Sequence, residues 1–149
     1  MRFTFDSNLL VYAVDARTPD KHEIALGLLR RAPHFDAALT AQALGEFLAV
    51  IGRKYPPYYE EARIQAGRWA RIFPVHDTAA RHIPEAAELA RRHRLQYWDS
   101  LIWTVAAAAA TEIFLTEDLQ DGLHIDGMTA VDPFAPENKD RLRALLSAG

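Results

Sequence analysis

The stretch FTFDSNLLVYAVD, which runs from Phe3 to Asp15, decides how the rest of the chain is interpreted. It starts as a short apolar strand, turns polar at Asp6, Ser7 and Asn8, and continues as an apolar helix. Asp, Ser and Asn are all preferred helix N-caps, so Asp6 taken alone is explained as a cap. The end of a strand is also where ligand sites form in parallel α/β sheets. The other acidic residues must distinguish these two interpretations.

The composition fits one compact domain in a reducing compartment. The chain has 149 residues, of which 50% are apolar and 25% charged, and it contains no cysteine. The N-terminal sequence MRFTFDSN lacks the pattern of a signal peptide, and the longest apolar run is too short to span a bilayer. We expect a cytoplasmic protein without a membrane span. The net charge of −3 argues against binding nucleic acid by bulk charge, although most of the 17 basic residues are arginine.

Strand and helix patterns alternate along the chain. The segments typical of short strands are FTF, DAALT, FPVHD, EIFLT and MTAVD. Helical patterns cover Asn8–Asp15, Asp20–Arg31, Ala41–Lys54, Tyr58–Ile72, Thr78–His93 and Trp98–Ala110. This alternation predicts right-handed crossovers and an α/β fold with a mostly parallel sheet of about five strands.

Prolines and the C-terminal segment refine this organisation. The two prolines of KYPPYY divide the central helical region into a protruding helical pair. Pro84 lies inside the Thr78–His93 pattern, so that helix either kinks or starts near Ile83. No repeat or linker divides the chain. We expect one domain over residues 1–134, with residues 135–149 forming its C-terminal helix or tail.

Further acidic residues follow the first strand, and each has an ordinary structural explanation. Glu46 lies four residues after Gln42, as on the solvent stripe of an amphipathic helix. Asp99 lies in the first turn of a helix, where the dipole favours an acid, but its apolar neighbours predict burial. Asp118 and Asp121 are typical turn acids. Each acid alone is easily explained by chance. The full set of acids, in this order relative to the strands and helices, is far less expected by chance.

Taken together, these motifs resemble the PIN-domain family, and most closely the VapC-type toxins of toxin–antitoxin pairs. FDSN resembles the opening strand of the family, LGEF its helical Glu, YWDSLI its Tyr-x-Asp-x-x-Ile helix start, LTEDLQDG its Thr-x-Asp motif, and TAVDPF its last strand. The resemblance runs from Arg2 to Phe134 and implies a three-layer α/β/α sandwich. It carries onto Asp6, Asn8, Glu46, Asp99, Thr116 and Asp118. The family often has another acid after the Thr-x-Asp motif, for which Asp121 is the nearest candidate.

A cluster of these carboxylates would raise the pKa values of its members or recruit a cation. Oxygen ligands without cysteine or paired histidines select Mg²⁺ or Mn²⁺ over Zn²⁺. The expected metal ligands are Asp6, Asp99, Glu46 and Asp118. The first two are expected to be direct or near-direct ligands, and the others to hold metal waters or a second ion. Asn8, Thr116 and Ser7 are expected to orient these groups by hydrogen bonds.

The resemblance implies a metal-dependent endoribonuclease that acts as a toxin, binds a cognate antitoxin and forms a homodimer. The alternatives are a PIN nuclease of RNA processing or structured-DNA cleavage, and a catalytically inert PIN-like binding module, against which the retained acids argue. A haloacid-dehalogenase-like phosphatase needs a second Asp where this chain has Asn8. Candidates for RNA contact are basic and aromatic residues of the helical pair and the segment before YWDSLI: Arg53, Lys54, Tyr55, Tyr58, Tyr59, Arg63, Arg68, Arg71, Arg91, Arg92 and Arg94.

Overall fold

The computed structural model describes residues 1–147, in which six strands form one sheet. The strands are β1 (Phe3–Phe5), β2 (Ala37–Thr40), β3 (Val75–His76), β4 (Ile113–Leu115), β5 (His124–Ile125) and β6 (Met128–Val131). Their order is β3-β2-β1-β4-β6-β5, and every neighbouring pair is parallel except β5 with β6. The predicted α/β class and the mostly parallel sheet are confirmed.

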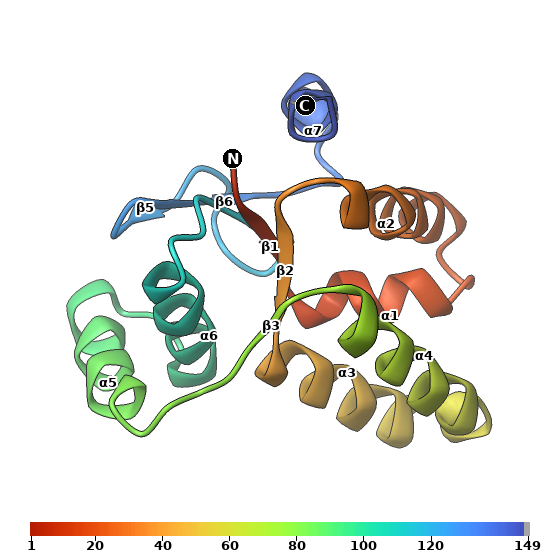
Figure 1. Cartoon of the computed structure of the whole chain (residues 1–149), viewed down its shortest axis with the longest axis horizontal. Coiled ribbons are helices and arrows are strands. Elements are labelled where there is room, and N and C mark those ends of the chain that lie inside the picture. Colours follow the sequence, from red (N-terminus) through yellow and green to blue (C-terminus); the bar gives the residue numbers. More distant parts are fainter. Residues whose placement is uncertain (148–149) are drawn as a thin grey trace.

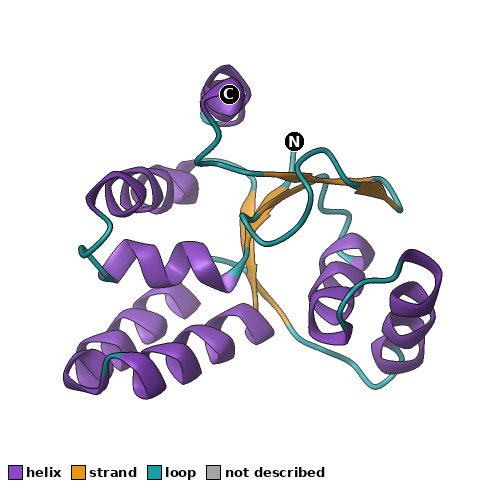
Figure 2. Ribbon diagram, turned by 180° about the vertical axis from the view of Figure 1, so that it is seen from behind, coloured by secondary structure: helices purple, strands orange, loops and turns teal. Residues whose placement is uncertain are grey.

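Helices cover both faces of the sheet, as the three-layer prediction requires. They are α1 (Ser7–Val14), α2 (Pro19–Arg31), α3 (Ala41–Lys54), α4 (Tyr59–Ile72), α5 (His82–His93), α6 (Tyr97–Ala108) and α7 (Lys139–Leu145). Figure 1 shows α1 to α4 on one side of the sheet and α5 with α6 on the other, and Figure 2 shows the same layers from behind. Parallel strands require such crossovers, because the chain must return to the same end of the sheet before each new strand.

The sixth strand is the part of the sheet that the sequence patterns did not predict. β5 pairs with β6 through the turn Asp126–Gly127, in which φ is 52° at Asp126 and 80° at Gly127. Asp-Gly is a preferred sequence for a two-residue hairpin turn, because both residues tolerate a positive φ. A strand of two residues is too short to show periodicity, so this dipeptide is the only signal that it leaves in the sequence.

The observed helices agree with the predicted ranges within two residues at each end, except at the start of α5. That helix begins at His82, so the predicted start at Thr78 is wrong and the alternative start near Ile83 is confirmed. Pro84 therefore lies in the first turn, where its missing N–H removes no bond within the helix. The imidazole of His82 accepts a hydrogen bond from the Ala79 N–H at 2.9 Å, which fixes the entry to the helix.

The predicted helical pair consists of α3 and α4, which pack together and are joined by a 3₁₀ turn at Pro56–Tyr58. Figure 1 shows this turn at the end of the pair that lies away from the sheet. The C-terminal helix α7 packs against α2, where the Arg31 guanidinium donates to the Leu146 carbonyl at 3.1 Å. The predicted helix or tail over residues 135–149 thus contains α7, while residues 148–149 lie outside the described part of the chain.

Large apolar side chains fill the space between the sheet and the helices. Phe5, Phe47, Trp103 and Phe114 are each 0% exposed. They belong to β1, α3, α6 and β4, so this core also fixes the elements that carry the predicted site residues. Among the helices of residues 1–147, none combines the length and the hydropathy that crossing a bilayer requires.

Candidate active site

Two of the predicted site residues directly follow neighbouring strands. In the sheet, β1 lies between β2 and β4, so the chain builds β2 and β3 on one side of β1 and then crosses to β4 on the other. Such a reversal creates a crevice at the carboxyl ends of the strands, which is the usual ligand position in parallel sheets. Asp6 follows β1 and Thr116 follows β4. The Asp6 N–H donates to the Leu115 carbonyl at 2.9 Å and holds the two strand ends together.

Asp6 is 3% exposed and both of its carboxylate oxygens accept hydrogen bonds. Oδ1 accepts from the Ser7 N–H at 2.8 Å, and Oδ2 accepts from the Thr116 hydroxyl at 2.7 Å. The bond from Ser7 caps α1, which confirms the cap interpretation of Asp6. The bond from Thr116 joins the same carboxylate to the end of β4. Cap and site are therefore compatible roles of one side chain.

No cationic side chain of the described residues pairs with Asp6. Over residues 1–147, Asp6, Glu46, Asp99 and Asp118 take part in no salt bridge. The pKa of Asp6 is raised to about 7, because burial, with a smaller contribution from the charges of Asp118 and Glu46, outweighs the lowering effect of the hydrogen bonds from Thr116 and Ser7. A carboxyl group in this condition favours a bound cation, because a cation stabilises its charged form.

Glu46 is oriented from two sides. Its Oε2 accepts from the Ser7 hydroxyl at 3.1 Å, and its Oε1 accepts from the Gln42 side-chain amide at 2.6 Å. The same Gln42 nitrogen donates to the Trp98 carbonyl at 2.8 Å and so connects α3 with the first turn of α6. From the sequence, Gln42 is expected only on the solvent stripe of its helix. The i, i+4 spacing of Gln42 and Glu46 indicates that their side chains can form a hydrogen bond. No sequence feature indicates the contact of Gln42 with Trp98.

Asp99 lies in the first turn of α6, half-buried, and its N–H donates to the Gln96 side-chain carbonyl at 3.2 Å. Gln96 is thus the N-cap of α6, a role that the sequence analysis missed. Burial raises the pKa of Asp99, and the charges of Asp118 and Glu46 raise it further. These two acids also raise the pKa of Asp6. The structure therefore brings the four predicted acids into one electrostatically coupled region.

The loop after β4 carries two adjacent acids with different surroundings. The Thr116 hydroxyl, which donates to Asp6, also accepts from the Asp118 N–H at 3.1 Å. Glu117, in contrast, accepts from the Tyr12 hydroxyl and from the Lys21 ammonium group, both at 2.6 Å. Glu117 is therefore engaged in a structural contact with α1 and α2, while Asp118 belongs to the coupled region.

Asn8 and Asp121 complete the set of predicted residues. Both amide atoms of Asn8 are buried and have no hydrogen-bond partner among the residues that the structure describes. Such groups are rare in folded proteins, so this amide is free to bond a ligand of the site or its water. Asp121 is instead engaged by other residues, since its Oδ1 accepts from the Asp132 N–H at 2.9 Å and from the Asn138 side-chain amide at 3.0 Å, and its charge is not among those that raise the pKa values of Asp6 and Asp99. It joins this loop to the C-terminal segment.

The donors fit a hard divalent cation by their chemistry. Within residues 1–147, no three Asp, Glu or His side chains stand close enough together to form a ready metal cage. The coupled region nevertheless offers only carboxylate oxygens, the ligands that Mg²⁺ and Mn²⁺ prefer, and two of its members have raised pKa values. Asp6 and Asp99 are the side chains whose charge such an ion would stabilise most. The arrangement of ligands stays a prediction.

Larger cavities lie elsewhere in the molecule. A cavity of about 850 Å³ lies between α5 and α6, where Arg81, Leu89 and Thr104 contribute to its wall. A second cavity, of about 490 Å³, is lined by residues that include His76 and His82. No predicted site acid lines either cavity. The acids thus lie outside both cavities, at the carboxyl ends of the central strands and the loops that follow them.

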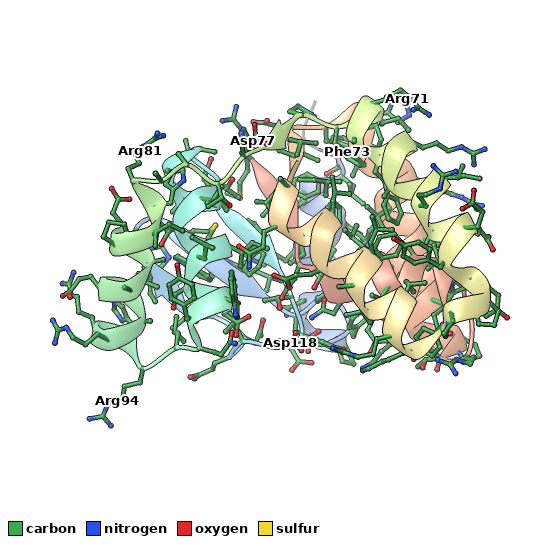
Figure 3. All side chains as sticks on the ribbon, turned by 90° about the horizontal axis from the view of Figure 1, so that it is seen from below. Arg71, Phe73, Asp77, Arg81, Arg94 and Asp118 are labelled. Carbon is green, nitrogen blue, oxygen red and sulfur yellow. The ribbon has the colours of Figure 1, made fainter. Side chains whose placement is uncertain are left out.

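The basic residues differ in their position relative to this edge. Arg63 and Arg91 each pair with a glutamate three residues earlier on their own helices. Figure 3 shows Arg71 on the opposite edge of the molecule from Asp118, whereas Arg94 lies along the same edge as Asp118. Arg94 is exposed and forms no salt bridge in the described part of the chain. Of the three arginines labelled in that view, Arg94 is the one on the edge that carries Asp118.

Comparison with known proteins agrees with the fold. The PIN domain family model matches residues 3–120, and the chain belongs to this family. No curated protein is significantly similar in sequence.

Solved structures with the same fold include proteins of toxin–antitoxin systems. VapC20 of Mycobacterium tuberculosis, described as a toxin that cleaves the sarcin-ricin loop, is 17% identical with a TM-score of 0.63, over 75% of this chain and 86% of that one. A toxin–antitoxin complex from Klebsiella pneumoniae is 21% identical with a TM-score of 0.65, over 87% and 96%. VapBC2 of Rickettsia felis, bound to a fragment of its promoter DNA, is 16% identical with a TM-score of 0.62, over 87% and 97%. These similarities confirm the predicted PIN-like fold.

Proposed function

We propose that this chain is a metal-dependent endoribonuclease that acts as the toxin of a toxin–antitoxin pair. The observation that carries the proposal is the set of four coupled acids without a cationic partner over residues 1–147, in a chain of the PIN domain family. Of these four acids, Asp6 is buried and Glu46 and Asp99 are partly buried. A buried acid without a cationic partner reduces stability, so this grouping is better explained by a ligand than by folding.

In this proposal, Asp6 and Asp99 bind Mg²⁺ or Mn²⁺, and Glu46 and Asp118 hold its waters or a second ion. When bound, the ion lowers the pKa of a water and neutralises the charge that develops on the attacked phosphodiester. The chain itself orients the ligands, because Thr116 and Ser7 fix both oxygens of Asp6. The Ser7 hydroxyl and the Gln42 amide fix the two oxygens of Glu46. The open amide of Asn8 would hydrogen-bond a water of the ion.

A protein antitoxin is the partner that the solved neighbours support, since two of them are complexes of a toxin with its antitoxin. Such a partner would inhibit this chain by covering the coupled acids or by displacing the ion. The homodimer and the cytoplasmic location remain predictions from the sequence. Light scattering of the purified protein over a range of concentrations tests the dimer.

The first experiment incubates the purified protein with labelled single-stranded RNA in Mg²⁺, in Mn²⁺ and in EDTA. The expected result is metal-dependent cleavage that is lost in the Asp6→Ala and Asp99→Ala variants, with folding intact by circular dichroism. Equal cleavage by the wild type and both variants would show a contaminating nuclease and contradict the assignment. Thermal unfolding adds a readout that does not depend on the substrate. Mn²⁺ should raise the melting temperature of the wild type more than that of either variant.

A further inference from the structure

One aromatic side chain beside the coupled acids is unusually exposed. Trp98 is 57% exposed, whereas Trp69 and Trp103 are 6% and 0% exposed. It directly precedes Asp99 in the first turn of α6. Burying a tryptophan ring is among the larger favourable contributions that one residue can make to a core. A ring left in water beside a candidate active site is therefore available for a ligand.

The backbone of Trp98 is held in a fixed position relative to the acids. Its carbonyl accepts from the Gln42 side-chain amide at 2.8 Å, and the same amide holds Glu46. Its indole packs edge-on against Tyr97, with ring centroids 5.2 Å apart and an angle of 73° between the planes. Both contacts attach Trp98 to elements that carry site acids, so a group that binds the ring is positioned with respect to those acids.

The charge of this edge favours an aromatic anchor. A nucleic acid that approaches the coupled acids meets their negative charge, so attraction to bases must contribute beside attraction to phosphates. Stacking of a base on an aromatic ring does not depend on net charge and accepts any base. Arg94, the exposed arginine on the same edge as Asp118 in Figure 3, precedes this helix and is suited to a phosphate of the same strand.

We propose that Trp98 is a stacking platform that holds an unpaired base of single-stranded RNA beside the phosphate to be cleaved. The inference rests on the proposed nuclease function and adds to it a substrate-positioning residue. A base inside a duplex is already stacked on both faces and cannot lie on the indole without being pulled out of the helix.

The test uses tryptophan fluorescence, because Trp98 is the exposed one of the three tryptophans in the chain. A single-stranded 2′-O-methyl RNA ten-mer, which resists cleavage, is titrated into the full chain in EDTA. We expect it to quench the fluorescence and to shield Trp98 from acrylamide. The same strand annealed to its complement should do neither. In Trp98→Phe the quenching of tryptophan fluorescence by RNA should disappear. Binding of the RNA, measured by anisotropy, should stay within about threefold of the wild type.

Variants separate stacking from general surface effects. Trp98→Ala should weaken binding of the single strand about tenfold or more, and should raise KM for RNA cleavage with little change in kcat. The matched control is Ile72→Ala, which removes an apolar side chain that is 54% exposed at the last residue of α4 and belongs to none of the candidate contacts. That control should bind within about twofold of the wild type.

The outcomes distinguish this inference from the function on which it rests. Wild-type affinity in Trp98→Ala, or equal quenching by the duplex, would overturn the stacking role even if metal-dependent cleavage is observed. Absence of RNA cleavage under every metal condition would instead overturn the proposed nuclease. Shielding of Trp98 that depends on protein concentration and not on RNA would assign the ring to a protein contact, and would also overturn the inference.

Discussion

Glu117 and Asp118 are adjacent on the loop after β4, yet the structure gives them opposite surroundings. Glu117 accepts short hydrogen bonds from Tyr12 and Lys21 and ties the loop to α1 and α2. Asp118 has no salt bridge among the described residues, and its charge raises the pKa values of Asp6 and Asp99. Acids of the first kind stabilise the fold, whereas acids of the second kind lower its stability until a cation binds.

The same division applies to the other acids of the chain. Asp15, Asp36 and Glu60 each pair with an arginine that is partly or largely exposed, and such pairs contribute little to stability. Asp6 and Asp99 are at least partly buried and have no such partner in residues 1–147. Site acids and structural acids should therefore respond differently to pH, to divalent metal and to substitution.

The largest expected effect concerns the titration of Asp6 in the metal-free protein. Its pKa is about 7 in the folded state against 3.8 for the ordinary group, so the folded state binds this proton more tightly than the unfolded state. Its contribution to the free energy of unfolding is therefore fully present below about pH 4 and is lost as pH rises through about 7. The loss is at most about 4 kcal/mol, since one pKa unit corresponds to about 1.4 kcal/mol.

Urea denaturation of the wild type and Asp6→Asn at about pH 5 and about pH 8 measures this effect, because the amide cannot titrate. The wild type should lose stability relative to the variant as pH rises, and Mg²⁺ or Mn²⁺ should restore the wild type at the higher pH. Parallel pH dependence of the two proteins would place Asp6 among the structural acids and remove the main support for the division.

The second effect compares the two neighbours on the loop directly. Asp118→Asn should lower kcat/KM for RNA cleavage by about 100-fold or more, because it removes a group proposed to hold the metal or its waters. Glu117→Gln should keep cleavage within about tenfold and lower stability by about 1 kcal/mol, because its pair with Lys21 is partly exposed. Cleavage kinetics and urea denaturation of both variants give the comparison. An equal loss of cleavage in the two would show that pairing does not separate the roles of these acids.

Much of the fold could be predicted from the sequence, because it follows from local patterns. The α/β class follows from the apolar strands and the helix periodicity. The order of the motifs predicts that Asp6, Glu46, Asp99 and Asp118 lie in one region. The pairing of individual acids could not be predicted in this way. Lys21 and Glu117 are 96 residues apart in the chain, and only the folded structure brings them together. The bond from Gln42 to the Trp98 carbonyl, over 56 residues, is hidden for the same reason.

A third effect tests the contact that joins Asp6 to the end of β4. Thr116→Val removes the hydroxyl that donates to Asp6 and accepts from the Asp118 N–H, at a cost of about 1–3 kcal/mol for buried partners left unsatisfied. The bond from Thr116 lowers the pKa of Asp6, so the variant should raise that pKa further. Carboxyl titration by NMR and urea denaturation measure both changes. Thr116→Ser, which restores the hydroxyl, is the control, and an unchanged Asp6 pKa in Thr116→Val would contradict the assigned contact.

The smallest effect concerns Asp121, the acid that the sequence suggested as an additional member of the site. Asp121→Ala should leave cleavage within about twofold of the wild type and lower stability by about 1 kcal/mol, because it removes the acceptor for Asp132 and Asn138. Asp121→Asn keeps a carbonyl oxygen and should recover most of that stability. If Asp121→Ala instead abolished cleavage while remaining folded, the site would extend beyond the coupled acids. Hydrogen bonds from neutral amides would then not be enough to classify an acid as structural. The lack of a cationic partner would be the only criterion left for assigning an acid to the site.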